Sequence, residues 1–200
     1  MEPSDNQSDD ALIQAARQGD EAAFEALYRR HRDWVLRTAL RFVGDEQDAL
    51  DVLQETFAYV LRKMTWGRAA DASPEFRLTA KFTTFLYPAV KHLSLALLRR
   101  KKRALSDDDA LRLVPAAPAP ESNLTDLFEV VRVLPEPQRE TLILRFVDGL
   151  SLAEIARALE VPIGTVKSRL HNALNALRGD PKTRRYFGEY GDEPQSRNGR

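Results

Sequence analysis

The chain has 200 residues, 43% of them hydrophobic and 30% charged, so it is long enough to form one or two small domains with apolar cores. Basic and acidic residues number 30 each, and the net charge therefore neither favours nor excludes a nucleic-acid partner. The absence of cysteine excludes disulfides and thiolate metal sites. The three histidines (His31, His92 and His171) do not have the spacing of metal ligands. We therefore expect no metal and no other cofactor.

Membrane insertion and catalysis are also not expected. No apolar run approaches the roughly 20 residues that span a bilayer, and the acidic N-terminus, MEPSDNQSDD, is unlike a secretory signal. The chain contains no glycine-rich phosphate loop, metal-binding cluster or nucleophile–base pair that would indicate an enzyme. These features predict a cytoplasmic, non-enzymatic protein.

The N-terminal part has the periodicity of amphipathic helices. Asp9 or Asp10 is placed to cap a short helix that ends at Gly19. Asp20 can cap a second helix, which runs to Gly44. Few strand patterns occur anywhere in the chain, so we expect an almost entirely helical protein.

The third predicted helix begins after Asp45 and has the sequence DEQDALDVLQETFAYVLRKM. Residues 44–55 contain five acids and no base. Asp48, Asp51 and Glu55 fall at helical spacing, roughly opposite the core stripe. A solvated face explains such a run simply, but like charges at these spacings are mildly destabilising, so a binding partner is the alternative. The expected core stripe consists of Ala49, Leu53, Phe57, Val60, Leu61 and Met64.

Residues 82–103, FTTFLYPAVKHLSLALLRRKKR, follow a loop-like stretch over 65–81 and predict a fourth helix. Pro88 implies that this helix either begins near Thr84 or is kinked. Six bases and no acid lie in the segment; they could contact phosphates or form a solvated tail. The aromatic residues at its start could pack in the core or stack on bases.

Residues 151–178 have the pattern of two helices joined by a tight turn. Ser151 and Glu154 form a capping box for the first helix. The second begins near Pro162 or Ile163, because proline is tolerated in a first turn. Its apolar face is Val166, Leu170, Ala173, Leu174 and Leu177. Its other face carries Thr165, Lys167, Ser168, Arg169, His171 and Asn172. A packed helical hairpin is one interpretation; the acid-free outer face favours a DNA-binding helix-turn-helix.

Three stretches resemble bacterial RNA polymerase sigma factors of the extracytoplasmic-function (ECF) group. GLSLAEIARALEVPIGTVKSRLHNALNALR, preceded by LPEPQRETLILRFVDG, is similar to their region four. DEQDALDVLQETF resembles the region-two segment "D..D..QE.F". The segment that begins FTTFLYP resembles the minus-ten segment "F..WLY.IA.N...D..R...R", although Phe85, His92 and Ala96 replace its usual Trp, Asn and Asp, and Pro88 is unexpected.

The resemblance implies an all-α fold of two small helical domains joined by a flexible linker. Region two is expected over 10–103, the linker over 104–121 and region four over 122–178. Residues 1–9 and 179–200 are expected to be tails.

The resemblance also implies two partners, core RNA polymerase (its largest-subunit clamp and its flap) and promoter DNA. Region two would dock on the clamp through Asp48, Asp51, Gln54, Glu55 and Phe57. It would read and melt the minus-ten element through Phe85, Lys91, His92, Arg99 and Arg100. Region four would read the minus-35 element, with Lys167, Ser168, His171 and Asn172 at base edges or nearby phosphates and with Thr165 and Arg169 holding the backbone.

Two other interpretations remain open at this stage. A stand-alone helix-turn-helix regulator would dimerise on half-sites about one DNA turn apart, but it leaves the acidic helix without a role. A protein-interaction module with the same fold could have lost initiation, since the residues usual for melting are changed. Members of the family are commonly held by an anti-sigma factor, while others are controlled by their own tails or by phosphorylation, and the sequence does not choose among these.

Overall fold

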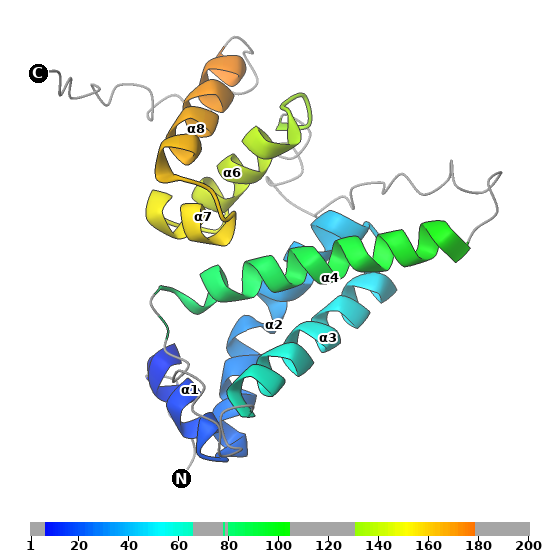
Figure 1. Ribbon diagram of the computed structural model, residues 1–200, viewed down its shortest axis with the longest axis vertical. Helices are drawn as coiled ribbons and strands as arrows, with labels where there is room; N and C mark the ends of the chain where they lie inside the picture. The colour runs from blue at the N-terminus through cyan, green and yellow to red at the C-terminus, as the bar shows by residue number, and fades with distance from the viewer. Residues whose placement is uncertain (1–6, 66–77, 79, 105–130, 179–200) are drawn as a thin grey trace, which may run out of the picture. The chain divides into compact units, whose positions relative to one another are not determined.

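The computed structural model describes residues 7–65, 78, 80–104 and 131–178. All regular elements in these residues are α-helices (Figure 1), which confirms the predicted fold class. The chain divides into two compact units, residues 1–118 and 119–200. Several predicted features lie largely or wholly outside the described residues: the loop at 65–81, the linker at 104–121 and the tail at 179–200.

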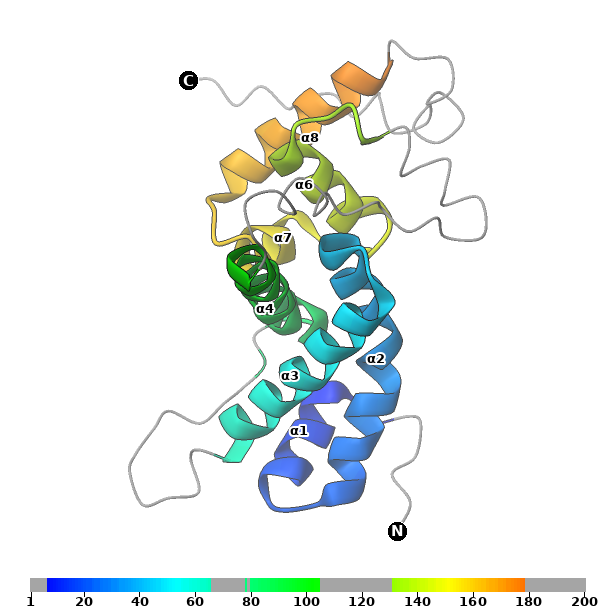
Figure 2. The ribbon, with the colours of Figure 1, turned by 90° about the vertical axis from the view of Figure 1, so that its right-hand side faces the viewer.

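In the described part of the first unit, the chain forms α1 (Asp9–Arg17), α2 (Glu21–Val43), α3 (Glu46–Thr65) and α4 (Phe82–Ala104). The helix α2 is central, because α1, α3 and α4 all pack against it (Figure 2), and α3 also packs against α4. Their apolar faces bury one continuous core. Its largest fully buried side chains include Phe82, Leu12, Ile13, Leu27, Met64 and Leu86.

The helix ends follow local rules, with one correction. Asp20 accepts a hydrogen bond from the Ala23 N–H at 3.1 Å, and Gly44 ends α2 with φ 73°, both as predicted. The cap of α1 was predicted wrongly as Asp9 or Asp10. The Ser8 hydroxyl is the cap and accepts from the Ala11 N–H at 3.2 Å.

Two expectations for α3 are also wrong. Asp48 was placed opposite the core stripe, but it is only 6% exposed. Leu61 was placed in the stripe, but it is 44% exposed, while its neighbours Val60 and Met64 are buried. The core side of α3 is therefore rotated slightly from the side that the apolar pattern alone suggested. In α4, the helix begins at Phe82 and includes Pro88 as an interior residue.

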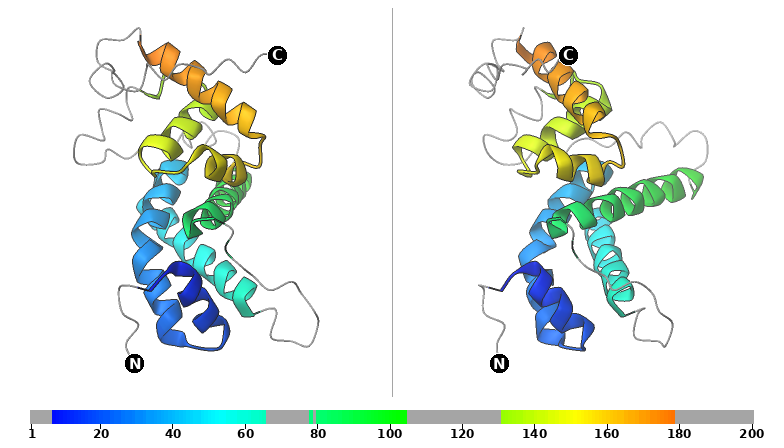
Figure 3. Two further views of the ribbon diagram at one scale, coloured as in Figure 1. Left: turned by 90° about the vertical axis from the view of Figure 1, so that its left-hand side faces the viewer. Right: turned by 60° about the vertical axis from the view of Figure 1, so that its left-hand side comes forward.

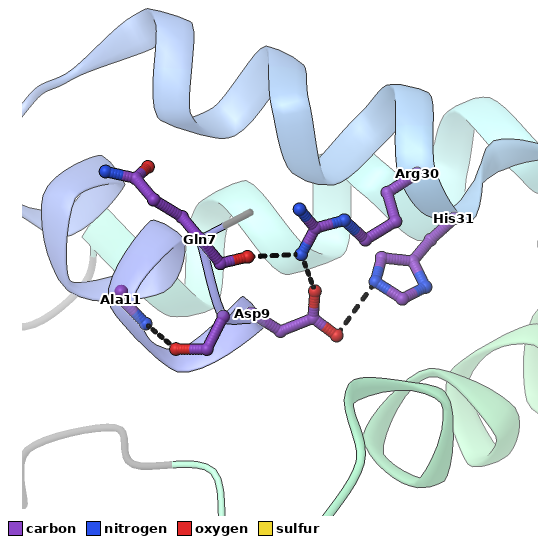
Figure 4. A network of polar contacts seen from close by, with 6 residues as sticks. Gln7, Asp9, Ala11, Arg30 and His31 are labelled. Atoms are coloured by element: carbon purple, nitrogen blue, oxygen red, sulfur yellow. Dashed lines mark hydrogen bonds and ion pairs between the residues drawn. The ribbon is translucent and has the colours of Figure 1, made fainter. Parts of the chain in front are cut away.

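Asp9 connects α1 to α2 through an ion pair with Arg30 and a hydrogen bond with His31 (Figure 4). Its carboxylate lies 2.7 Å from Arg30 Nη1 and 3.0 Å from His31 Nε2, and Arg30 also donates to the Gln7 carbonyl at 2.8 Å. The buried His31 ring in turn makes a T-shaped contact with the Phe82 ring, with centroids 5.0 Å apart. Burial alone would raise the pKa of Asp9, but hydrogen bonds from His31 and Arg30, together with their charges, hold that pKa below its usual value.

This lowered pKa predicts a pH-dependent stability. A carboxyl group with a lowered pKa stabilises the fold above its unfolded pKa of about 3.9, and that contribution is lost as the pH falls through the lowered folded value. We expect Asp9→Asn to reduce the free energy of unfolding of the first unit by about 1 kcal/mol at pH 7, and by less below about pH 4. Denaturant titrations from pH 7 downward measure this. Asp10→Asn, an exposed neighbour in the same first turn, is the control; an equal loss in both variants would contradict the prediction.

The second unit contains α6 (Glu136–Phe146), α7 (Leu152–Ala158) and α8 (Ile163–Arg178). Both α6 and α7 pack against α8 (Figure 3). Arg145 Nη1 donates to the Leu150 carbonyl at 3.0 Å across the connection between α6 and α7, where Gly149 has φ 66°. Val131, Leu134, Leu142, Ala173 and Leu177 form the buried core cluster.

No helix in the described parts of either unit is long and apolar enough to cross a membrane.

Candidate functional site

The start of α7, the first helix of the α7–turn–α8 segment, is fixed by a local interaction that was visible in the sequence. The Ser151 hydroxyl accepts from the Glu154 N–H at 3.3 Å, and the Glu154 carboxylate accepts from the Ser151 N–H at 2.8 Å. This confirms the predicted capping box, which satisfies two N–H groups at the start of α7. The box therefore fixes where the first helix of the pair begins.

The turn after α7 ends the helix with the two hydrogen bonds of a Schellman motif. The Val161 N–H bonds the Ala156 carbonyl at 3.0 Å, and the Glu160 N–H bonds the Arg157 carbonyl at 3.2 Å. Glu160 supplies the left-handed residue, with φ 54°. This compact turn leads directly into α8, which begins at Ile163 as predicted.

The apolar side of α8 confirms the prediction. Val166, Ala173 and Leu177 are buried, and Leu170 and Leu174 pack partly buried against the same core. This side anchors α8 to α6 and α7. The polar residues on its remaining surface are therefore held in a fixed orientation.

The outward face of α8 carries hydroxyl, amide, imidazole and ammonium groups and no acid. Lys167, Ser168, His171 and Asn172 are exposed, whereas Thr165 and Arg169 are half-buried at the margins. The Ser168 hydroxyl donates to the Gly164 carbonyl at 2.7 Å, which directs its proton inward and leaves its oxygen as an acceptor. Such groups can bond base edges and phosphates.

Further along the same face, two residues that the sequence analysis missed position His171. Asn175 Nδ2 lies 2.8 Å from His171 Nε2, and Arg178 Nη1 donates to Asn175 Oδ1 at 3.3 Å. The Asn175 amide nitrogen is a donor, so this contact is a hydrogen bond when His171 Nε2 accepts. The spacing of four residues between His171 and Asn175 is the sequence signal that could have indicated the pair.

The predicted minus-ten residues lie along much of α4. Phe85, His92 and Arg99 are spaced by seven residues, which places them on one face of the helix, with Lys91 and Arg100 to either side. His92, Arg99 and Arg100 are exposed, whereas Lys91 is half-buried. Arg99 Nε donates to the Leu95 carbonyl of its own helix at 3.1 Å.

Phe85 begins this face and is half-buried. Its ring is stacked against Phe82 at a centroid distance of 6.0 Å, and against Tyr59 of α3 at 6.2 Å. The ring is therefore held in place by packing and still has an exposed part.

The predicted polymerase-binding residues of α3 separate into two groups. Asp51, Gln54 and Glu55 are exposed on one face. Asp48 and Phe57 are buried, and the Phe57 ring makes T-shaped contacts with Phe24 (centroids 6.3 Å apart) and Tyr28 (4.9 Å). We define the docking face as Asp51, Gln54 and Glu55, the members of the predicted set that a partner could reach directly.

Asp48 has a partner inside the unit. Its carboxylate lies 2.6 Å from Lys101 Nζ of α4, and the two residues are 53 positions apart in the sequence. The Asp48 side chain is 9% exposed and that of Lys101 is 42% exposed. A pairing at this sequence distance depends on how α3 packs against α4, so no local pattern could have indicated it.

The sequence matches two family models. Residues 27–104 match the model described as Sigma-70 region 2, and residues 124–177 match the model described as Sigma-70, region 4. Together they cover the helices that carry the acidic, basic and helix-turn-helix features described above.

Curated relatives extend this similarity over nearly the whole chain. The ECF RNA polymerase sigma factor SigE of Mycolicibacterium smegmatis is 34% identical over 190 residues, spanning 89% of this chain and 69% of that protein. The RNA polymerase sigma-H factor of Pseudomonas aeruginosa is 30% identical (86% and 92%). The ECF sigma factor SigW of Bacillus subtilis is 28% identical (83% and 92%).

Solved structures share the fold. CnrH, in complex with the cytosolic domain of CnrY, aligns with a TM-score of 0.59 at 22% identity, covering 86% of this chain and 96% of that one. The sigma factor RpoE of Bartonella quintana, in complex with the anti-sigma factor NepR, aligns with a TM-score of 0.59 at 21% identity (78% and 94%).

Proposed function

The chain belongs to the ECF group of RNA polymerase sigma factors and acts with RNA polymerase in promoter-directed initiation of transcription, and we propose that its two units divide that work. The first unit docks on the clamp of the largest polymerase subunit through the docking face of α3. It reads and opens the minus-ten element through α4. The second unit reads the minus-35 element through α8, beside the polymerase flap.

The observation that carries the proposal is the outward face of α8. An exposed, acid-free face on the second helix of a helix-turn-helix matches what the major groove requires, because carboxylates there would be repelled by phosphates. Lys167, Ser168, His171 and Asn172 are the groups we assign to bases or nearby phosphates. Thr165 and Arg169, at the margins, are assigned to the DNA backbone.

For the minus-ten element we assign the exposed residues of α4. His92, Arg99 and Arg100 contact the DNA, with Lys91 at the flank and the Phe85 ring at the end of the same face. Two units joined by an intervening segment suit this division, because binding of one unit raises the effective concentration of the other at its own site.

A stand-alone regulator is the less favoured alternative. It offers no role for the exposed docking face of α3, which a polymerase partner explains. Family membership also makes an anti-sigma factor a further proposed partner.

Replacing Lys167 with alanine tests the role of α8. We expect binding of the polymerase complex to a promoter to weaken by about tenfold, since one lost base or phosphate contact costs roughly 1–3 kcal/mol. Binding is measured on promoter fragments with systematic minus-35 substitutions and at several salt concentrations. Weakening confined to one base position identifies a base contact. Uniform weakening with a smaller salt dependence identifies a phosphate contact.

The matched control is Arg132→Ala, which removes an exposed cation of the same unit outside α7 and α8. It should change affinity by less than twofold. If Lys167→Ala also changed affinity by less than twofold at every sequence and salt concentration, the assignment of α8 to the minus-35 element would be wrong.

A further inference from the structure

Asp48 and Lys101 each belong to a run of like-charged residues, but they pair with each other inside the first unit. Asp48 belongs to the acidic run of α3, but its side chain is only 9% exposed and its carboxylate is 2.6 Å from Lys101 Nζ. Lys101 belongs to the basic run at the end of α4, but its ammonium group is directed at that carboxylate. Neither group is oriented as a first contact for an outside partner.

We propose that Asp48 and Lys101 are positioning residues: their ion pair holds the basic end of α4 against the start of α3, so that the neighbouring bases meet promoter phosphates. This inference rests on the proposed function and refines it. Asp48 is not a polymerase contact, and Lys101 is not a phosphate contact. Arg100 and Lys102, which flank Lys101 and are exposed, are the groups oriented toward DNA.

The position of the pair explains why it can act in this way. Asp48 lies in the first turn of α3, whose start is fixed by the Asp45 carboxylate accepting from the Asp48 N–H at 2.9 Å. Lys101 lies in the last turn of α4. The residues after α4 lead to the second unit, and the pair joins the last turn of α4 to the first turn of α3 within the first unit. A nearly buried carboxylate also requires a partner, because an unpaired buried charge is costly.

The same pair reduces the charge presented to DNA. Five consecutive bases, Arg99 to Arg103, would form a strong but poorly ordered phosphate-binding run. Asp48 neutralises the middle one, while Arg99 and Arg103 donate from Nε to carbonyls of their own helix at 3.1 and 3.2 Å. The result is an ordered set of cations in place of a flexible one.

The experiment combines core binding, promoter binding and a double-mutant cycle, all with the full chain. The variants are Asp48→Asn, Lys101→Gln and both together; Lys102→Gln, alone and with Asp48→Asn, is the matched control. Affinity for core polymerase is measured first. Affinity of the assembled complex for a promoter is then measured across salt concentrations.

We expect core affinity to stay within twofold in every variant. Promoter affinity should fall about fivefold for Asp48→Asn and for Lys101→Gln, and the double variant should be no worse than either, because both remove one interaction. The loss of promoter affinity caused by Lys102→Gln should instead add to the loss caused by Asp48→Asn. The salt dependence should be unchanged in Lys101→Gln, whereas Lys102→Gln should reduce its slope by about 0.7 to 0.9.

Three results would overturn the inference: a loss of core affinity in Asp48→Asn, additive losses for Asp48 and Lys101, or a reduced salt slope in Lys101→Gln. Lys101→Arg, which keeps the charge, should restore promoter affinity. These results can be distinguished from a failure of the proposed function, because in that case the wild-type chain itself would not direct polymerase to a promoter.

Discussion

Reversing the charges of Asp51 and Glu55 is expected to weaken binding to core RNA polymerase by about 100-fold or more. Both carboxylates are exposed on the docking face of α3, and a partner that accepts this acidic face would meet two cations in the variant. Juxtaposing like charges across an interface costs several kcal/mol, and each 1.4 kcal/mol is a factor of about ten in affinity. Titration of labelled protein with core polymerase measures the loss.

Asp33→Lys is the matched control for this prediction. Asp33 is an exposed acid of α2 in the same unit, next to Arg32 at 3.4 Å, and it lies outside the docking face. Its reversal should leave core affinity within about threefold, since exposed ion pairs contribute little. If Asp33→Lys and the Asp51→Lys, Glu55→Lys variant lost affinity equally, binding would depend on total charge and α3 would not be the docking element.

Replacing Val166 with aspartate is expected to unfold the second unit. Val166 is 0% exposed on α8, the helix against which both α6 and α7 pack. Burying an uncompensated charge costs about 3–5 kcal/mol, which is comparable to the whole stability of a unit this small. Helical circular dichroism should fall partly, promoter binding should be lost, and unfolding of the first unit should be unchanged.

Ile163→Asp provides the control on the same helix. Ile163 is one turn earlier and 46% exposed. An aspartate there lies in the first turn of α8, where negative charge is favourable. The second unit should stay folded in this variant. If Ile163→Asp unfolded it as Val166→Asp does, the assignment of the inner and outer faces of α8 would be wrong.

The helix-turn-helix was predictable because its determinants are local. Ser151 and Glu154 sit three residues apart and cap each other, and Pro162 marks the start of the next helix within one residue. The apolar face of α8 follows directly from its 3.6-residue period. The Glu160 turn conformation was not predictable, since it is an unusual residue for a left-handed position.

Errors arose where tertiary contacts override a local pattern. Asp9 has the right residue type for a cap, but Arg30 and His31 bind its carboxylate and Ser8 caps the helix instead. Asp48 continues the spacing of Asp51 and Glu55, but it is nearly buried and forms an ion pair with Lys101 of α4. Each partner comes from another helix, at a sequence separation that periodicity does not report.

The types of side chain at the candidate site could be predicted from the sequence better than their orientations. The hydroxyl, amide and basic residues of α8 could be selected from the sequence, because a helical period places them outside. Side-chain orientations could not be predicted in this way: the contact between Asn175 and His171 in α8 and the stacking of Phe85 of α4 on Phe82 and on Tyr59 were not foreseen. Those orientations determine which atom is presented to a partner.

We conclude that this chain directs core RNA polymerase to its promoters. The most direct test is to incubate core polymerase with genomic DNA fragments, with and without the protein, and to map the 5′ ends of the transcripts. We expect discrete start sites that require the protein and disappear with the Asp51→Lys, Glu55→Lys variant. Start sites that do not depend on the protein, or binding of the free protein to DNA as a dimer with no effect on initiation, would contradict it.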